Sequence, residues 1–366
     1  MARTYLLIAG IIAALIVVGI AIYVSMLGTG TGGTSTISSA SATASTSPSP
    51  ETLRGELDFY TSLPKEIAIE LVKMFNEKYP NVKINIVRSG TSKLMTKLLA
   101  EIKSGRIIAD VVWLADPASI EVLKERGVLM KYVPPEARFV PPNLRDKDGY
   151  WIAGRVIMPV IAYNTNIVEN PPSRWSDLVN ESYVATLPAE WRNSRWLAIP
   201  NPLYSGAAAV MVYAISSKYG WSFFEELKSN GWLFVEKSNG VVLQGVISGK
   251  YPIGITLDYM VRQRKAAGDP IDMVIPQDGA IVIPSPIAII KDTPYPEAAK
   301  AFVRFMLSKE VQEFLASKGF IPARTDVSPP PGAPKLSELK VIEIDWSKLA
   351  QVLEDVKKKF EEIVTS

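Results

Sequence analysis

The stretch GELDFYTSLPKEIAIELVKMFNEKYPNVKINIVR (residues 55–88) decides the fold. Residues 55–62 form a short apolar run that predicts a strand, and residues 82–88 alternate apolar and polar positions, which also predicts a strand. Residues 64–80 predict a helix, because apolar side chains recur on one face at helical spacing: Ile67, Leu71, Met74 and Phe75. A strand, a helix and a second strand in this order indicate an α/β unit with a parallel sheet.

The same alternation continues outward from this unit. Residues 89–105 predict a helix that stops at Gly105, residues 109–115 a buried strand, and residues 116–127 a further helix. The pattern therefore predicts a mostly parallel sheet with helices on both faces and right-handed connections.

A long extended segment, residues 154–168, separates this block from a second α/β block. The second block includes a predicted helix over residues 207–218 and continues to about residue 268. An extended run over residues 281–291 and two helices within residues 296–320 follow. We therefore expect an α/β protein of two lobes, each with a mostly parallel sheet, joined by a hinge at the long extended segment.

Both ends of the chain carry segments outside this pattern. Residues 5–27 are apolar and uncharged, long enough for a bilayer core that needs about 20 residues, and Arg3 predicts a cytoplasmic N-terminus. Residues 28–50 are rich in Gly, Ser, Thr and Pro, a composition typical of a disordered tether. We predict a membrane anchor or signal-anchor over residues 1–27, a stalk over 28–54, lobe 1 over 55–162 with the return of 269–325, lobe 2 over 163–268, and a Pro-rich linker with a C-terminal helix that packs on the body over 326–366.

Composition narrows the function. The 366 residues include no histidine and no cysteine, which removes Ser-His-Asp and Cys-His nucleophile systems, the usual zinc sites and disulfides. The net charge of +3 comes without a Lys/Arg-rich run, so we expect no nucleic-acid partner. We predict no cofactor, no metal in the first interpretation, and no enzymatic activity. A carboxylate-based extracellular hydrolase stays as a distant alternative, because paired acids alone suffice for glycoside cleavage.

Small polar residues follow several predicted strands. In open parallel sheets, ligands bind beyond the carboxyl ends of the strands, where the next helices start. The helix at 207–218 has an uncharged first turn, which leaves backbone N–H groups available to an anion. We therefore predict a site for a small anionic solute formed by residues at these ends: Thr61, Ser62, Ser89, Gly90, Thr91, Asp116, Ser205, Gly206, Ala207, Asp258 and Tyr259.

Two alternatives stay open at these positions. Each Ser or Thr could simply cap its helix, and Asp116, directly before a proline, fits a helix cap better than a ligand group. Asp258 could accept a hydrogen bond from the solute or from backbone amides, and Tyr259 could be a ligand or a half-buried core residue.

Three segments resemble the ABC-transporter solute-binding proteins of the ferric-iron-binding type. Residues 59–129 resemble the opening of that family, with a Thr-Ser turn, an Arg-Ser-Gly loop and an Ala-Asp-Val-Val-Trp strand. PNPLYSGAAA (residues 200–209) resembles its Pro-x-x-Ser-Gly segment, and EAAKAFVRFMLSKEVQEFL (residues 297–315) resembles its C-terminal helix pair.

The resemblance implies a type II periplasmic-binding fold, closure of two lobes over a solute, and delivery to an ABC permease in the membrane. Iron binders of this family use adjacent tyrosines, whereas this chain has Asp258 at the first matching position. Residues 268–290 look more like relatives that bind organic phosphates. We therefore expect a phosphate ester or phosphonate as solute and a monomeric body on the extracellular face. Ferric iron is the alternative, with Tyr204, Asp258 and Tyr259 as its ligands.

Overall fold

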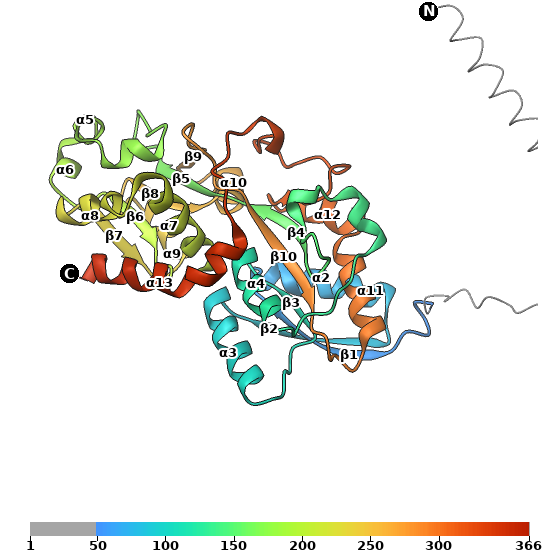
Figure 1. Cartoon of the computed structure of the whole chain (residues 1–366). Helices are drawn as coiled ribbons and strands as arrows, with labels where there is room; N and C mark the ends of the chain where they lie inside the picture. Colours follow the sequence, from blue (N-terminus) through green and yellow to red (C-terminus); the bar gives the residue numbers. More distant parts are fainter. Residues whose placement is uncertain (1–48, 366) are drawn as a thin grey trace, which may run out of the picture. The chain divides into compact units, whose positions relative to one another are not determined.

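The computed structural model describes residues 49–365 as two mixed β-sheets flanked by helices (Figure 1). The six-stranded sheet has the order β11-β4-β10-β3-β1-β2, and the five-stranded sheet the order β7-β6-β8-β5-β9. We call the six-stranded sheet with its helices lobe 1 and the five-stranded sheet with its helices lobe 2. The strands are β1 (Gly55–Thr61), β2 (Val82–Arg88), β3 (Val111–Trp113), β4 (Ile152–Ile157), β5 (Pro159–Asn164), β6 (Leu197–Pro200), β7 (Leu233–Glu236), β8 (Ile253–Leu257), β9 (Ile271–Val274), β10 (Ile283–Ile289) and β11 (Ile321–Pro322).

The expectation of mostly parallel sheets is wrong. In lobe 1 only β1–β2 and β1–β3 run parallel, and β10 pairs antiparallel with both β3 and β4. In lobe 2, β5 likewise pairs antiparallel with β8 and β9. The reason is the chain path. Strand β4 leads the chain out of lobe 1, and β10 brings it back. These two strands therefore do not both share the direction of the parallel strands in the βαβ units of the same sheet.

The chain changes lobes over very few residues. Strand β4 ends in the first sheet at Ile157, and β5 begins in the second sheet at Pro159, so the crossing lies at Met158. The return runs between β9 and β10, from Val274 to Ile283. The expected boundaries at 162/163 and 268/269 fall inside β5 and before β9, two strands that both belong to the lobe 2 sheet.

The helices of the amino-terminal block start where the sequence predicts. Pro64 and Gly90 precede α2 and α3, and the side chain of Asp116 caps α4 by accepting a hydrogen bond from the Ser119 amide at 2.8 Å. The α-helices are α2 (Lys65–Lys78), α3 (Thr91–Lys103), α4 (Pro117–Glu125), α5 (Glu181–Val184), α6 (Ala189–Arg192), α7 (Gly206–Tyr219), α8 (Ser222–Ser229), α9 (Asn239–Ile247), α10 (Asp258–Ala266), α11 (Pro296–Met306), α12 (Lys309–Ser317) and α13 (Trp346–Thr365). Short 3-10 turns lie at η1 (Pro135–Phe139), η2 (Pro142–Leu144), η3 (Trp175–Val179) and η4 (Leu336–Glu338).

The C-terminal helix α13 packs on the body. It contacts α4 of lobe 1 as well as α7 and α8 of lobe 2 (Figure 1). Phe360 is fully buried and meets Phe224 of α8 edge-on, with ring centroids 5.4 Å apart. The apolar face of α13 therefore packs on the two lobes rather than on a second copy of the helix.

The predicted anchor over residues 1–27 and most of the predicted stalk lie outside the described residues. Within residues 49–365, no helix combines the length and the apolar character that a bilayer crossing requires.

Candidate functional site

The polar residues that follow β1, β2 and β3 lie together at one edge of the lobe 1 sheet. The amide of Ser62 donates to the carbonyl of Trp113 at 3.0 Å, and the amide of Ser89 donates to the carbonyl of Thr61 at 3.2 Å. These bonds continue the parallel ladder past the strand ends. The structure thus brings the predicted site residues Thr61, Ser62 and Ser89 onto one edge of the lobe 1 sheet.

The two threonine hydroxyls at this edge have partners within lobe 1. Thr61 Oγ1 accepts from the Leu63 amide at 3.1 Å, and Thr91 Oγ1 accepts from the Ala115 amide at 3.1 Å. Both residues are buried. Ser62 differs, because its Oγ is buried and has no hydrogen-bond partner among the described residues. Of these three hydroxyls, that of Ser62 is the one left available to a solute.

The bare start of α7 is capped by its own chain. Ser205 Oγ accepts from the Ala208 amide at 3.2 Å, and the side-chain amide of Asn239 donates to the same oxygen at 3.0 Å. The amides of Gly206 and Ala207 have no acceptor among the residues of the described body. Gly206 lies directly against Asp116 of lobe 1, so in this arrangement protein atoms occupy the space beside this helix start.

Asp116 is a fully buried helix cap. Its Oδ1 accepts from the Ser119 amide and its Oδ2 from the Ser119 hydroxyl at 3.1 Å. Burial raises the pKa of this carboxyl, while the bonds from Ser119 and the charge of Lys357 in α13 oppose that rise. The capping alternative left open for Asp116 matches these contacts.

Asp258 holds the hinge together. Its Oδ1 accepts from the Met158 amide at 2.9 Å, and its Oδ2 pairs with Arg262 one turn along α10. Asp258 is fully buried. Both carboxylate oxygens of Asp258 therefore have partners within the protein.

Tyr259 lies beside a buried arginine. The ring of Tyr259 packs on Phe320, with centroids 4.1 Å apart, and the guanidinium of Arg155 lies 5.4 Å from the Tyr259 centroid. Burial raises the pKa of Tyr259, and the charges of Arg155 and Arg88 oppose that rise. Tyr259 is only 6% exposed, so it belongs to the core of the hinge region as well as to the candidate site.

Arg155 is the residue that the sequence interpretation missed. It is 2% exposed, and its Nη1 has no hydrogen-bond partner among the described residues. Its Nε lies 3.5 Å from Ser285 Oγ, a hydroxyl that also receives the Trp113 indole N–H at 3.2 Å. A signal was present, because Arg155 is the only charged residue between 151 and 164, a run otherwise typical of a fully buried strand.

The charges around this centre are mainly positive. Arg155 and Arg88 both act on the Tyr259 hydroxyl, and the one carboxylate among the influences on Tyr259, that of Asp258, is paired with Arg262. Burial lowers the pKa of Arg155, while Tyr259 and Asp258 oppose that shift. A buried guanidinium with an unpaired N–H group favours an anion at this position.

The predicted iron ligands lie in different surroundings. Tyr204 is 41% exposed, whereas Tyr259 is buried next to Arg155. Over residues 49–365, no group of three or more acidic side chains gathers in a way that could hold a metal ion. A cationic guanidinium beside a phenol also disfavours a trivalent cation there.

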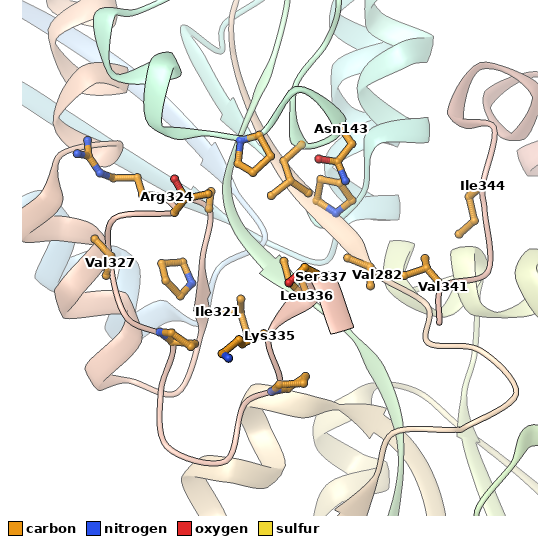
Figure 2. Close-up of a pocket in the computed structure, with 18 of the residues that line it drawn as sticks. Asn143, Val282, Ile321, Arg324, Val327, Lys335, Leu336, Ser337, Val341 and Ile344 are labelled. Atoms are coloured by element: carbon orange, nitrogen blue, oxygen red, sulfur yellow. The ribbon is translucent and has the colours of Figure 1, made fainter. Parts of the chain in front are cut away.

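A separate cavity of about 520 Å³ lies away from the predicted site residues (Figure 2). Its lining includes Val282 of the return crossing, Ile321 of β11 and residues 334–337 and 341–344 of the C-terminal linker. Two of its charged side chains have partners, Arg324 with Asp326 and Lys335 with Glu338, whereas Glu343 is exposed. The mostly apolar lining and these two ion pairs distinguish this cavity from the arginine centre.

Comparison with known proteins identifies the class. The profile of the bacterial extracellular solute-binding protein family matches residues 70–341. The chain belongs to this family.

A probable ABC transporter periplasmic-binding protein of Sinorhizobium fredii is 25% identical over 292 residues, covering 76% of this chain and 78% of that protein. Among solved structures, the fructose-6-phosphate-bound periplasmic binding protein AfuA of Actinobacillus pleuropneumoniae matches 85% of this chain and 99% of its own, at 24% identity and a TM-score of 0.75. Iron-bound HitA of Pseudomonas aeruginosa matches 83% of this chain and 99% of its own, at 22% identity and a TM-score of 0.72. These likenesses establish the two-lobed periplasmic-binding fold.

Proposed function

We propose that this chain is the extracellular solute-binding subunit of an ABC importer and that its solute carries a phosphate or a similar compact anionic group. The observation that carries the proposal is Arg155, a buried guanidinium whose Nη1 has no partner within the described body. An anion that receives this N–H group would also compensate the buried charge.

Other polar groups of lobe 1 fit the same anion. The hydroxyl of Ser62 is buried and unpaired at the end of β1. Arg88 is anchored by its Nε, which donates to the Leu63 carbonyl at 2.9 Å, and its remaining N–H groups stay available to an anion. Together with Tyr259, these groups supply hydroxyl and guanidinium donors, the chemistry that recognises phosphate oxygens.

The lobe arrangement supports capture by closure. Ser62, Arg88 and Arg155 belong to lobe 1, whereas Tyr259 follows β8 of lobe 2. A solute that contacts both sets stabilises the closed form only when both sides are satisfied, which shifts the population toward closure. The closed form is then the species that an ABC permease accepts. We further propose that residues 1–27 tether this body to the membrane through the stalk.

Ferric iron is the second candidate, because one similar structure is described as iron-bound. Tyr259 is the residue that could serve it, yet Arg155 lies next to that phenol and Asp258 is paired with Arg262. Hard cations need several oxygen ligands, and this centre offers mainly N–H donors. The anion is therefore the better match.

Titration calorimetry on the full-length chain in detergent tests the proposal with inorganic phosphate, a hexose phosphate and ferric citrate as probes. We expect a phosphate-bearing probe to bind, and Arg155→Gln to weaken it by about 10- to 100-fold. Arg106→Gln, at an exposed position of the same lobe, is the matched control and should leave affinity unchanged. Equal affinity in Arg155→Gln contradicts the proposal. A visible absorption band with ferric citrate that disappears in Tyr259→Phe would instead establish the iron alternative.

A further inference from the structure

Two glycines, one from each lobe, meet atoms of the opposite lobe. A Cβ added to Gly90, which precedes α3 of lobe 1, would lie 2.7 Å from the carbonyl oxygen of Tyr204 in lobe 2. A Cβ added to Gly206, which opens α7 of lobe 2, would lie 2.0 Å from Asp116 Oδ2 and 3.1 Å from the Cβ of Thr91 in lobe 1. Real Cβ atoms essentially never approach within 3.0 Å, so neither position has room for a side chain in this arrangement.

Backbone conformation does not explain these glycines. Gly90 has φ −65° and ψ 149°, an extended conformation that alanine adopts freely, and Gly206 is the first residue of a helix. The opposite lobe therefore excludes the side chain at both positions. The two contacts are reciprocal, because each lobe contributes one glycine and presents one obstacle.

The contact around Gly206 is deeply buried. Asp116 is fully buried and Thr91 is 2% exposed. The helix α13 covers this region because it contacts both α4 and α7, and its Lys357, itself buried, acts on the charge of Asp116. The lobes thus meet here in a packed interface, and a small increase in side-chain volume has to move a lobe.

We infer that Gly90 and Gly206 form a closure stop, a pair of contacts that sets how closely the two lobes approach in the closed form. Any side chain at either position holds the lobes further apart, because the obstacles are a backbone carbonyl and a doubly hydrogen-bonded carboxylate that do not swing away. A second consequence, which rests on the proposed function, is that lobes held further apart weaken any contact that a solute makes with both of them.

The closure stop is tested by measuring the distance between the lobes directly. The chain contains no cysteine, so Lys93→Cys on α3 and Gln244→Cys on α9, both exposed, give a unique pair of spin-label sites on the full-length protein. We expect Gly206→Ala and, separately, Gly90→Ala to lengthen the inter-label distance of the closed population and to weaken phosphate binding by about tenfold. Gly240→Ala on α9 is the control, because its added Cβ meets nothing nearer than 3.8 Å.

A compensating change separates the stop from general damage. Asp116→Ser keeps a capping hydroxyl for α4 but removes the oxygen that meets Gly206. We expect the double variant Asp116→Ser/Gly206→Ala to return toward the wild-type distance. Unchanged distances in both single alanine variants, or a double variant as open as Gly206→Ala, overturn the stop. Lengthened distances in a protein that binds no phosphate probe support the stop and overturn the proposed solute.

Discussion

Asp258 and Met158 bond to each other twice across the hinge. The Met158 amide donates to Asp258 Oδ1 at 2.9 Å, and the Asp258 amide donates to the Met158 carbonyl at 2.9 Å. Met158 is the residue at which the chain passes from one sheet to the other. The first residue of α10 therefore fixes the peptide about which the lobes are joined, and the pairing with Arg262 fixes the carboxylate in turn.

Asp258→Ala should destabilise the protein strongly. The substitution removes the carboxylate that compensates the buried Arg262, which keeps only its bond to the Gly319 carbonyl, and it leaves the Met158 amide without an acceptor. Removal of one member of a buried pair costs about 3–5 kcal/mol. Asp258→Asn keeps an acceptor for Met158, so it should cost less. The control is Asp272→Ala, which removes a surface pair with Lys265 and should cost no more than about 1 kcal/mol. Urea unfolding measures all three, and equal losses in Asp258→Ala and Asp272→Ala contradict this role.

Asp278 should give stability that depends on pH. This residue of the return crossing accepts hydrogen bonds from the Trp175 amide at 3.0 Å and from the Tyr219 hydroxyl. Burial alone would raise its pKa, but these bonds outweigh burial, and the pKa of Asp278 lies below its ordinary value. A lowered folded-state pKa gives stability that is present above the unfolded pKa of about 3.9 and is lost as pH falls through the folded pKa.

We therefore expect Asp278→Asn to be less stable than wild type by about 1–2 kcal/mol at pH 7, by unfolding monitored through tryptophan fluorescence. The difference should stay constant down to about pH 5 and shrink below about pH 4, as the wild-type carboxyl takes up a proton. A difference that grows in acid contradicts the assignment.

Sequence periodicity was sufficient for the elements of this fold but not for the directions of its crossing strands. The predicted helix at 207–218 is α7, and the extended run at 154–168 contains β4 and β5. Pairing direction depends on which distant strands lie side by side, and β10 meets β3 and β4 only after the chain has returned from lobe 2. The local sequence pattern carries no information about this course of the chain through lobe 2.

For the candidate site as well, the sequence predicted some of the residues, whereas their surroundings depend on tertiary contacts. Strand-end reasoning found Tyr259, which contacts Arg155 directly, and Ser62, whose buried hydroxyl has no partner among the described residues. It also found Asp116 and Gly206, whose contact is with each other. Whether a helix start faces a solute or the opposite lobe depends on tertiary contacts. Arg155 could have been found from sequence, since a single charge within an apolar strand is costly unless it has a partner.

Removing the aromatic anchor of α13 should separate this helix from lobe 2. Phe360→Ala deletes a fully buried ring that packs edge-on against Phe224, and such truncations cost about 3–5 kcal/mol. Lys358→Ala, at an exposed position on the same helix, is the control and should change the free energy of unfolding by less than about 0.5 kcal/mol. Hydrogen exchange should also rise in α13 of Phe360→Ala alone. Protection of α13 that matches the wild type would contradict its anchoring through Phe360.

A single methyl group in β4 should strain the core of lobe 1. A Cβ added to Gly154 would lie 2.4 Å from Cζ2 of Trp113 and 2.6 Å from Cδ1 of Ile287, and both side chains are buried. Overpacking of this kind costs about 1–3 kcal/mol, so Gly154→Ala should lower the midpoint of urea unfolding. Gly240→Ala is the matched control, because its Cβ has room and alanine is favoured over glycine within a helix by about 0.5–1 kcal/mol. The two substitutions add the same methyl group. If Gly154→Ala lowers the free energy of unfolding while Gly240→Ala raises it, the loss in Gly154→Ala comes from contact with Trp113 and Ile287. A stabilising Gly154→Ala would mean that this part of the sheet is packed less tightly than these distances require.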